Sequence, residues 1–597
     1  MIEKNKIRTQ SFTFFVFACC SAVFFQYLYP YHLFFKEQTQ LFLFTSDYFL
    51  SYFDKPAWLS CYMGDFITQF FYLNGGGAIV LTLIFLIELL LIRNILKIFS
   101  ETPSFLLALF PVIFDWIFHC ELNYFVSASV AMIIVLSSFL LFYLIKNDKL
   151  SFITALFFVP VIYNLAGSLS FLFPFLVFFA DIKNGRNRWQ LWLLLMMFAG
   201  LFPLFLQSVH LITIRQAYLH PLISTKHSAV SLCLLLILFC LQFSFFQKIT
   251  FSTGRSILFF LPLLFALLIA GLQHSADFHR EKIFALATET YFENPDKVIL
   301  LSDKYKLQNN IATYYTNLAL SQKGMMPEKL FDYYQPASNG LFLPVNTQSG
   351  WITIFFSNDV FFHLGDMNMA QHAAMLGQTF SVKHRSSRIV KRLAEINLVN
   401  GDTAVARKYL RMLDATLFHS EWAASLENMI DGKDTPADSV RKTSDGKTIA
   451  VDSIDRFIEM RARIIKHDTL RKASDYVTSL RLLVESNPEN TYAMNYLLCY
   501  YLLNKDVSPF YTTFEKYIKQ NSANHSTLYM EALMITLFKD KAPPKKIKSL
   551  GITDEVITNF VEYTKLFDES NGNMDLIREK YGSTYWFYYH FAQMKEK

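Results

Sequence analysis

One stretch between the first two hydrophobic runs decides how the chain is organised: YHLFFKEQTQLFLFTSDYFLSYFDKPAWLSCYMGDFITQFFY (31–72). It is too long for a turn and too aromatic for a linker. Its two segments 41–53 and 57–72 each combine an aromatic face with a face of Asp, Ser, Gln or Thr, which predicts helices lying flat in a membrane interface. The loop holds four acids, Glu37, Asp47, Asp54 and Asp65, which are the first candidates for a working site. Glu37 follows the first apolar run, where a carboxylate near lipid headgroups is costly unless it has a role or a partner. The alternative is that the acids only keep the upper faces hydrated.

The composition divides the chain into a membrane half and a soluble half. Of the 597 residues 53% are hydrophobic and 62 are Phe, too many for an ordinary soluble protein. The excess ends near residue 273, after which the sequence becomes charged and amphipathic. We therefore expect an all-α protein: a transmembrane domain over 1–273, with an outer loop at 31–76, followed by a soluble domain over 274–597.

Nine apolar runs are candidates for membrane spans, each judged against the roughly 20 residues that cross a bilayer core. They lie at 11–30, 77–95, 104–120, 124–145, 151–167, 169–182, 189–209, 228–247 and 256–273. The fifth and sixth runs are short and are separated only by Gly167 and Ser168, so they are either two tilted helices or one re-entrant pair. The first run also fits a secretory signal, but it is rich in Phe and no small-x-small cleavage site follows it.

Basic residues predict the orientation. With nine spans, all the Lys and Arg clusters beside the runs fall on one side, which the positive-inside rule identifies as the cytoplasm. Examples are Lys4, Arg93, Lys146, Arg186 and Lys248. The N-terminus is then cytoplasmic in a bacterial inner membrane, and both the 31–72 loop and the soluble half face outward.

A second polar group ends the third run on the same outer side. Asp115 and His119 are four residues apart and share a helix face, and Glu121 follows them. An acid inside a span is a functional candidate, although a buried Asp–His hydrogen bond that only joins two helices is the alternative. Glu88 also lies in a span, where the nearby Arg93 suggests that its side chain snorkels to the interface.

The outer loop after the seventh run, 210–227, is basic and so departs from the charge rule. Arg215 and His220 in this loop are candidates for binding an anion such as a phospholipid headgroup or a polyprenyl phosphate. A few charges on a hydrated loop are an equally good explanation.

Together these features resemble the layout of the GT-C superfamily of glycosyltransferases. The resemblance implies that Glu37 or Asp47 takes a proton from an acceptor hydroxyl while Arg215 and His220 steady the departing phosphate of a lipid-linked sugar donor. Asp115 is the third catalytic candidate, and His119 and Glu121 are substrate-binding candidates. The loop lacks the paired acids that many members of this superfamily carry.

The soluble half favours a solenoid of tetratricopeptide-like helix pairs. Three segments have this pattern, 293–324, 397–423 and 486–521, and a Gly/Asp/Ser/Lys stretch near 435–447 indicates a flexible link. The runs FHLGDMNMAQHAAM (362–375) and IVKRLAEINLVNGDTAVARKYLRMLDATLFHSEWA (389–423), with KEQTQLFLFTSDYF (36–49) and YYTNLALSQKGMMPEKLF (314–331), are similar to a family of uncharacterised bacterial multi-pass proteins with a domain of unknown function. That resemblance covers both halves and implies no activity.

Several classes are excluded or disfavoured. The chain has no P-loop, dinucleotide-binding glycine pattern, HExxH or CxxC, and its net charge of +6 is too diffuse for nucleic-acid binding. We expect no cofactor and no metal site, although a divalent ion stays open. Transport is the least favoured function, because polar residues at mid-membrane are nearly absent.

The sequence thus leaves two hypotheses. One is an outward-facing transferase that uses a polyprenyl-phosphate sugar, and the other is a membrane-anchored repeat scaffold that recruits an envelope protein or glycan. An enzyme requires Glu37, Asp47 and Asp115 to converge on one site, whereas a scaffold does not.

Overall fold

The computed structural model describes residues 2–100, 105–242, 253–346, 348–381, 384–432, 441–442, 448–449, 452–466, 471–517 and 526–593. The contacts divide the chain into two compact units. The first unit comprises Met1–Glu281 together with the short segment Ala415–His419, and the second comprises Lys282–Asp414 and Ser420–Lys597. Both units are helical, apart from one pair of two-residue antiparallel strands, β1 (Arg441–Lys442) and β2 (Thr448–Ile449).

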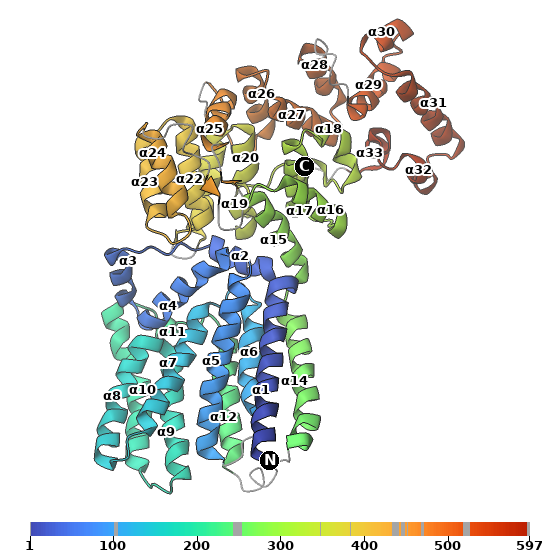
Figure 1. Cartoon of the computed structure of the whole chain (residues 1–597). Coiled ribbons are helices and arrows are strands. Elements are labelled where there is room, and N and C mark those ends of the chain that lie inside the picture. Colours follow the sequence, from blue (N-terminus) through green and yellow to red (C-terminus); the bar gives the residue numbers. More distant parts are fainter. Residues whose placement is uncertain are drawn as a thin grey trace. The chain divides into compact units, whose positions relative to one another are not determined.

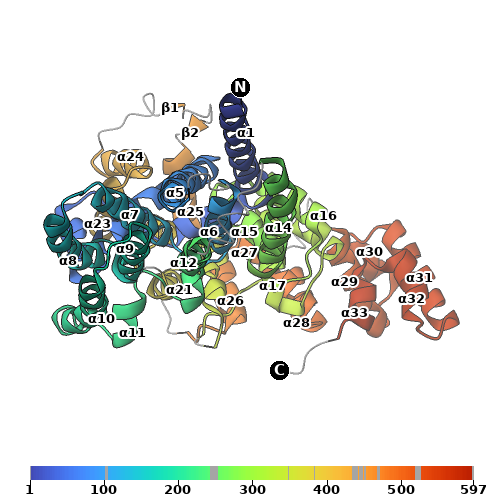
Figure 2. The ribbon, with the colours of Figure 1, turned by 90° about the horizontal axis from the view of Figure 1, so that it is seen from below.

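The first unit is a bundle of long apolar helices (Figure 1). They are α1 (Ile2–Val23), α5 (Gly76–Phe99), α6 (Leu109–His119), α7 (Val126–Tyr143), α8 (Asp148–Ala166), α9 (Leu172–Lys183), α10 (Trp189–His210), α12 (Ala229–Leu241) and α14 (Thr253–Ser275). Figure 2 looks along this bundle and shows α7, α8 and α9 next to one another, in agreement with the contacts of α7 with both. Between α8 and α9 the chain passes through a 3₁₀ turn, Gly167–Phe171, where Gly167 has φ +66°.

Fewer helices qualify as membrane spans than the nine predicted. By length and composition five helical stretches in the described residues can cross a membrane, or six if the bent pair Phe260–Ser275 and Phe278–Tyr291 is one span. The predicted runs 104–120 and 228–247 give the helices Leu106–His119 and Thr225–Leu241, which are short for a bilayer core. The predicted fifth and sixth runs lie within one stretch of 36 residues, Asp148–Lys183. Because the orientation argument used nine spans, the membrane side of each loop remains a prediction, and Lys248 lies outside the described residues.

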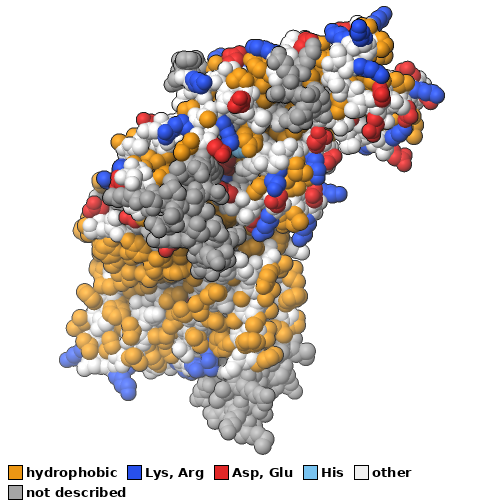
Figure 3. Space-filling model, turned by 45° about the horizontal axis from the view of Figure 1, so that its top comes forward, with side chains coloured by type: hydrophobic (Ala, Val, Ile, Leu, Met, Phe, Trp, Pro, Cys, Tyr) orange, Lys and Arg blue, Asp and Glu red, His pale blue; other side chains and the backbone are white. Residues whose placement is uncertain are grey.

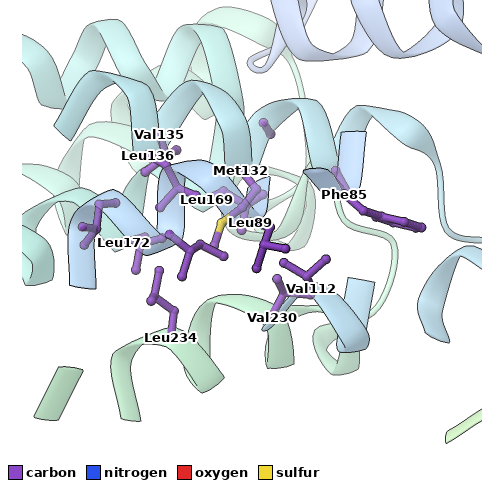
Figure 4. Close-up of a cluster of buried hydrophobic side chains, with 14 of the residues drawn as sticks. Phe85, Leu89, Val112, Met132, Val135, Leu136, Leu169, Leu172, Val230 and Leu234 are labelled. Carbon is purple, nitrogen blue, oxygen red and sulfur yellow. The ribbon is translucent and has the colours of Figure 1, made fainter. Parts of the chain in front are cut away.

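The core of the first unit is continuous through the bundle. Phe85 and Leu89 of α5 pack with Val112 of α6 and Met132 of α7 in a dry cluster (Figure 4). Hydrophobic side chains are also exposed on the face of this unit seen in Figure 3, which suits a lipid environment. Aliphatic side chains face both the interior and the surface, so the helices show little amphipathic periodicity.

The expected interfacial loop forms short helices. They are α2 (Pro30–Gln38), α3 (Ser46–Leu50) and α4 (Trp58–Thr68), with 3₁₀ turns at Ser51–Asp54 and Gln69–Tyr72. The Glu281 carboxylate accepts hydrogen bonds from the backbone N–H groups of Tyr31 and His32, at 2.7 and 2.8 Å, and so caps the start of α2. Helix α4 packs on α7 at Gly64, where an added Cβ atom would lie 2.5 Å from the backbone nitrogen of Ser127.

The second unit consists of shorter helices. They are α15 (Phe278–Tyr291, which begins in the first unit), α16 (Pro295–Tyr305), α17 (Asn310–Gln322), α18 (Met326–Lys329), α19 (Trp351–Phe356), α20 (Asn358–Leu364), α21 (Met367–Thr379), α22 (Ser387–Asn400), α23 (Thr403–Asp414), α24 (Ser420–Ile430), α25 (Asp452–Arg463), α26 (Tyr476–Ser486), α27 (Thr491–Leu503), α28 (Val507–Tyr517), α29 (Thr527–Lys539), α30 (Pro544–Ser549), α31 (Asp554–Glu569), α32 (Met574–Tyr581) and α33 (Tyr585–Phe591). Helix pairs lie where the sequence predicts them, as in α16–α17, α22–α23 and α27–α28. Their lengths follow no fixed repeat, so the unit is a helical domain in which tetratricopeptide repeats are not shown. Most of the predicted link near 435–447 lies outside the described residues.

Candidate functional site

Helix α2 is held against the C-terminal end of α6 by a buried lysine. The ammonium group of Lys36 donates hydrogen bonds to the backbone carbonyls of His119 and Tyr124, each at 2.9 Å. Burial lowers the pKa of Lys36 to about 7, although the nearby carboxylates of Glu121 and Asp115 oppose this shift. With Glu281 at its start and Lys36 near its end, α2 is fixed at both ends.

The neighbouring side chain, Glu37, is buried and faces a histidine from a distant part of the sequence. Its Oε1 lies 3.8 Å from Nε2 of His419, which belongs to the 415–419 segment of the first unit. This segment is held by a hydrogen bond from the Phe44 N–H to the Ala415 carbonyl, at 2.7 Å. Tyr72 stacks on Phe418, with ring centroids 5.6 Å apart, and meets the His419 ring edge-on at 5.0 Å. Burial and the charge of Glu37 raise the pKa of Tyr72 to about 12.

The facing polar atoms of Glu37 and His419 are left without hydrogen bonds in the described part of the chain. The distance of 3.8 Å exceeds that of a hydrogen bond. Nε2 of His419 is buried and has no partner there, and no donor reaches the Glu37 carboxylate. An unpaired buried polar atom is rare and costly, so Nε2 of His419 marks a position where a small polar group of a ligand can bind beside Glu37.

Asp115 and His119 come together, as predicted, in a fully buried network. The Asp115 carboxylate accepts hydrogen bonds from the hydroxyl of Tyr124 and from Oγ of Ser129, the latter at 2.8 Å. Nε2 of His119 lies 2.8 Å from the same Ser129 hydroxyl and 3.6 Å from Asp115. The network joins α6 to α7, and its carboxylate is already satisfied by protein groups. This arrangement is the structural alternative that the sequence left open.

Glu121 joins the basic outer loop to the bundle. Its carboxylate accepts from Lys226 at 2.6 Å, from His227 at 3.2 Å and from the Ser275 hydroxyl at 3.1 Å. Burial would raise the pKa of Glu121, but the hydrogen bonds from His227 and Lys226 outweigh it and lower the pKa to about 2. Lys226, one of the cations of the 210–227 loop, is therefore already paired with Glu121.

The remaining predicted residues lie apart from these groups. Asp47 is exposed in the first turn of α3, and Arg215 is exposed on the short helix α11 (Ile214–Leu219). His220 follows α11, and its Nε2 lies 3.3 Å from the sulfur of Cys61. No contact among the described residues brings Asp47 or Asp115 to Glu37. Among those residues there is also no group of three or more His, Cys, Asp or Glu that could hold a metal ion.

Sequence reasoning missed three residues and misread a fourth. Lys36 could have been identified from the sequence, because a cation next to Glu37 and close to an apolar run needs a partner. Tyr72 and His419 could not have been, because only the fold brings them to Glu37. The interpretation that Glu88 snorkels is wrong: its side chain is fully buried near the middle of α5, beside Asp115.

Comparison with known proteins gives one match. No curated protein matches the chain, and no solved structure matches it. A protein-family profile described as "Family of unknown function (DUF6057)" matches residues 5–592, which include both structural units. The chain therefore belongs to this family of unknown function.

Proposed function

We propose that the chain is a membrane-embedded, GT-C-like glycosyltransferase that works at the outer membrane face with a lipid-linked sugar donor. The observation that supports this function is the Glu37–His419 pair: two buried groups that face each other at 3.8 Å without a hydrogen bond to either facing atom in the described residues. Five predominantly apolar helical stretches supply the membrane environment that a polyprenyl-phosphate donor needs.

In the proposed reaction an acceptor hydroxyl binds between Glu37 and His419. Its oxygen forms a bond to the anomeric carbon of the donor sugar, its proton passes to the Glu37 carboxylate, and the bond from that carbon to the phosphate oxygen breaks. General-base catalysis of this kind typically contributes about 10² to 10⁴ in rate. Helix α2 holds the base in place through Lys36 and Glu281, which favours a well-defined geometry.

The departing phosphate needs a cation or a hydrogen-bond donor. The sequence assigns that role to Arg215 and His220, and Arg215 is exposed and offers the planar donor set that suits phosphate. No contact among the described residues brings either one to Glu37, so in the proposed reaction the donor phosphate must extend from the Glu37 site to this loop. Asp115, His119 and Glu121 act as positioning residues. They hold the end of α6, to which Lys36 binds, and so they support α2.

The test is turnover of a radiolabelled polyprenyl-phosphate sugar by the purified full chain in detergent. Glu37→Gln is compared with wild type and with Asp47→Asn, an exposed acid of the same loop. We expect transfer or hydrolysis to fall at least 100-fold in Glu37→Gln and to persist in Asp47→Asn. Equal loss in both variants, or undiminished turnover in Glu37→Gln at matched folding, would remove Glu37 from the mechanism.

Two observations favour the second candidate, a membrane-anchored scaffold that recruits an envelope protein or glycan. No contact among the described residues brings Asp47 or Asp115 to Glu37, and a scaffold does not require these acids to converge. The Asp115 carboxylate is fully engaged by Tyr124 and Ser129, as expected of an acid whose role is structural. The same assay separates the two functions. Wild-type protein that turns over no donor would leave the scaffold as the better proposal.

A further inference from the structure

The second unit contains a cavity that the proposed transferase reaction does not use. Its volume is about 250 Å³, and its walls come from α15, α16, α17, α20, α22, α25 and α27. This volume is slightly below the range of pockets that take drug-sized ligands, so the cavity suits a small ligand or one residue of a larger one.

One face of α22 supplies the floor. Arg388, Lys391, Arg392 and Glu395 follow the spacing i, i+3, i+4 and i+7, which places all four side chains on the same side of the helix. Arg388 and Arg392 both reach Asp359 of α20, at 2.6 and 3.2 Å, and Arg392 also pairs with Glu395 at 2.6 Å. These linked ion pairs fix the direction of Arg388, Arg392, Asp359 and Glu395 before a ligand arrives.

Aromatic rings back the cations. The guanidinium of Arg392 lies 4.0 Å from the ring centre of Phe362, and that of Arg463 lies 4.6 Å from the ring centre of Tyr492. The ammonium group of Lys391 lies 5.0 Å from the ring centre of Tyr291. Each of these rings is therefore covered on one side by a cation, and a ligand can meet only the part of the ring that the cation leaves uncovered.

The charge balance decides the class of ligand. The lining has four cationic side chains, at positions 388, 391, 392 and 463, and four carboxylates, at positions 293, 359, 395 and 459. A balanced lining of this kind gives no preference for a polyanion. An apolar ligand would cover these donors and acceptors without replacing their water. Hydroxyl groups both donate and accept, so a polyhydroxylated ring can bond to guanidinium and carboxylate neighbours at once while its C–H face packs on a tyrosine ring.

The guanidinium of Arg463 lies 3.4 Å from the carboxylate of Glu459, which is one turn earlier on α25. We propose that this cavity binds one sugar residue of a glycan, with hydroxyls on the Arg392–Glu395 and Arg463–Glu459 pairs and the sugar ring against the part of Tyr492 that Arg463 leaves uncovered. The site is separate from Glu37. Sugar binding in this cavity does not depend on the proposed function. The further step, in which the bound glycan serves as the acceptor of the transferase, rests on the proposed function.

Saturation-transfer NMR on the full chain in detergent tests the proposal, with neutral methyl glycosides of glucose, galactose, mannose and N-acetylglucosamine as probes. Tyr492→Ala and Arg463→Gln change the edge of the cavity and leave the buried Asp359 pairs intact. Tyr334→Ala is the matched control, because this tyrosine is exposed and lies outside the cavity.

We expect saturation transfer to at least one glycoside, reduced severalfold in Tyr492→Ala and Arg463→Gln and unchanged in Tyr334→Ala. No transfer to any glycoside in wild type, or equal transfer in all variants, would overturn the proposal. Displacement of a bound glycoside by free glycine would also overturn it, by identifying a site for zwitterions. Sugar binding without wild-type turnover would refute the transferase and keep the sugar site.

Discussion

Oε1 of Glu37 and Nε2 of His419 lie 3.8 Å apart, although Glu37 lies in α2 and His419 lies between α23 and α24. The contact forms because residues 415–419 pack in the first unit, although the residues before and after them in the sequence belong to the second unit. Its backbone bond to Phe44 and its ring contacts with Tyr72 hold the imidazole in place. The pair is therefore built by the fold and is absent from any local sequence pattern.

His419→Gln tests whether this pair works as a unit. Glutamine keeps a polar side chain but cannot hold a proton as imidazole does, so we expect donor turnover to fall severalfold. We expect the double variant Glu37→Gln/His419→Gln to be no slower than Glu37→Gln alone, because groups that act together lose their effects together. His279→Gln, an exposed histidine of the same unit, serves as the control. Additive losses in the double variant would show that the two residues act independently.

Lys36 predicts a pH dependence of stability. Its pKa is about 7 in the folded chain against 10.5 in the unfolded chain, so between these values the unfolded chain holds a proton that the folded chain has released. Stability therefore rises with pH across this window, by up to about 1.4 kcal/mol per pH unit. Thermal unfolding in detergent measures this rise as the melting temperature of wild type minus that of Lys36→Met.

Two further comparisons test the predicted change of melting temperature with pH and the overall loss of melting temperature in Lys36→Met. Lys55→Met, at an exposed position, should leave the slope unchanged. Lys36→Met should also lower the melting temperature throughout, because two buried carbonyls lose their donor at a cost of about 1–3 kcal/mol each. A difference between wild type and Lys36→Met that is flat from pH 7 to 10.5 would contradict the assignment.

The sequence predicted the helical class, the apolar first unit and the Asp115–His119 pairing, because these follow from composition and from spacing along one helix. The sequence overestimated the number of spans, because hydropathy alone does not show how long a helix an apolar run forms. The run 104–120, for example, gives only the short helix Leu106–His119. The sequence did not predict the partner of Glu37, because His419 reaches Glu37 through tertiary structure. Glu88 was misread for a related reason: its distance from Arg93 along α5 says nothing about the buried face on which it lies.

Arg388 and Asp359 predict a large stability effect in the second unit. Burial would raise the pKa of Asp359, but Arg388 and Arg392 outweigh it and hold the pKa below its ordinary value, so the carboxylate stays charged. Arg388→Met leaves that charge with one guanidinium, and removing one partner of a buried pair typically costs about 3–5 kcal/mol. Urea unfolding monitored by tryptophan fluorescence checks this. We expect Asp359→Asn/Arg388→Met to recover part of the loss, and Arg578→Met, at an exposed arginine, to change little.

Two glycine substitutions test the packing of the outer loop on the bundle, and we expect them to differ in sign. In an unobstructed helix Gly→Ala stabilises by up to about 1 kcal/mol, because alanine loses less backbone entropy on folding. Gly200 of α10 has nothing within 4 Å of an added Cβ, so Gly200→Ala should leave the melting temperature unchanged or raise it. At Gly64 the added Cβ would lie 2.5 Å from the Ser127 nitrogen and 2.6 Å from its Cα, and neither atom can move without shifting α7. Gly64→Ala should therefore lower the melting temperature in detergent, by the equivalent of about 1–3 kcal/mol. If it matched Gly200→Ala, α4 would not be seated on α7, and the support that this contact gives to the 31–72 loop would be lost.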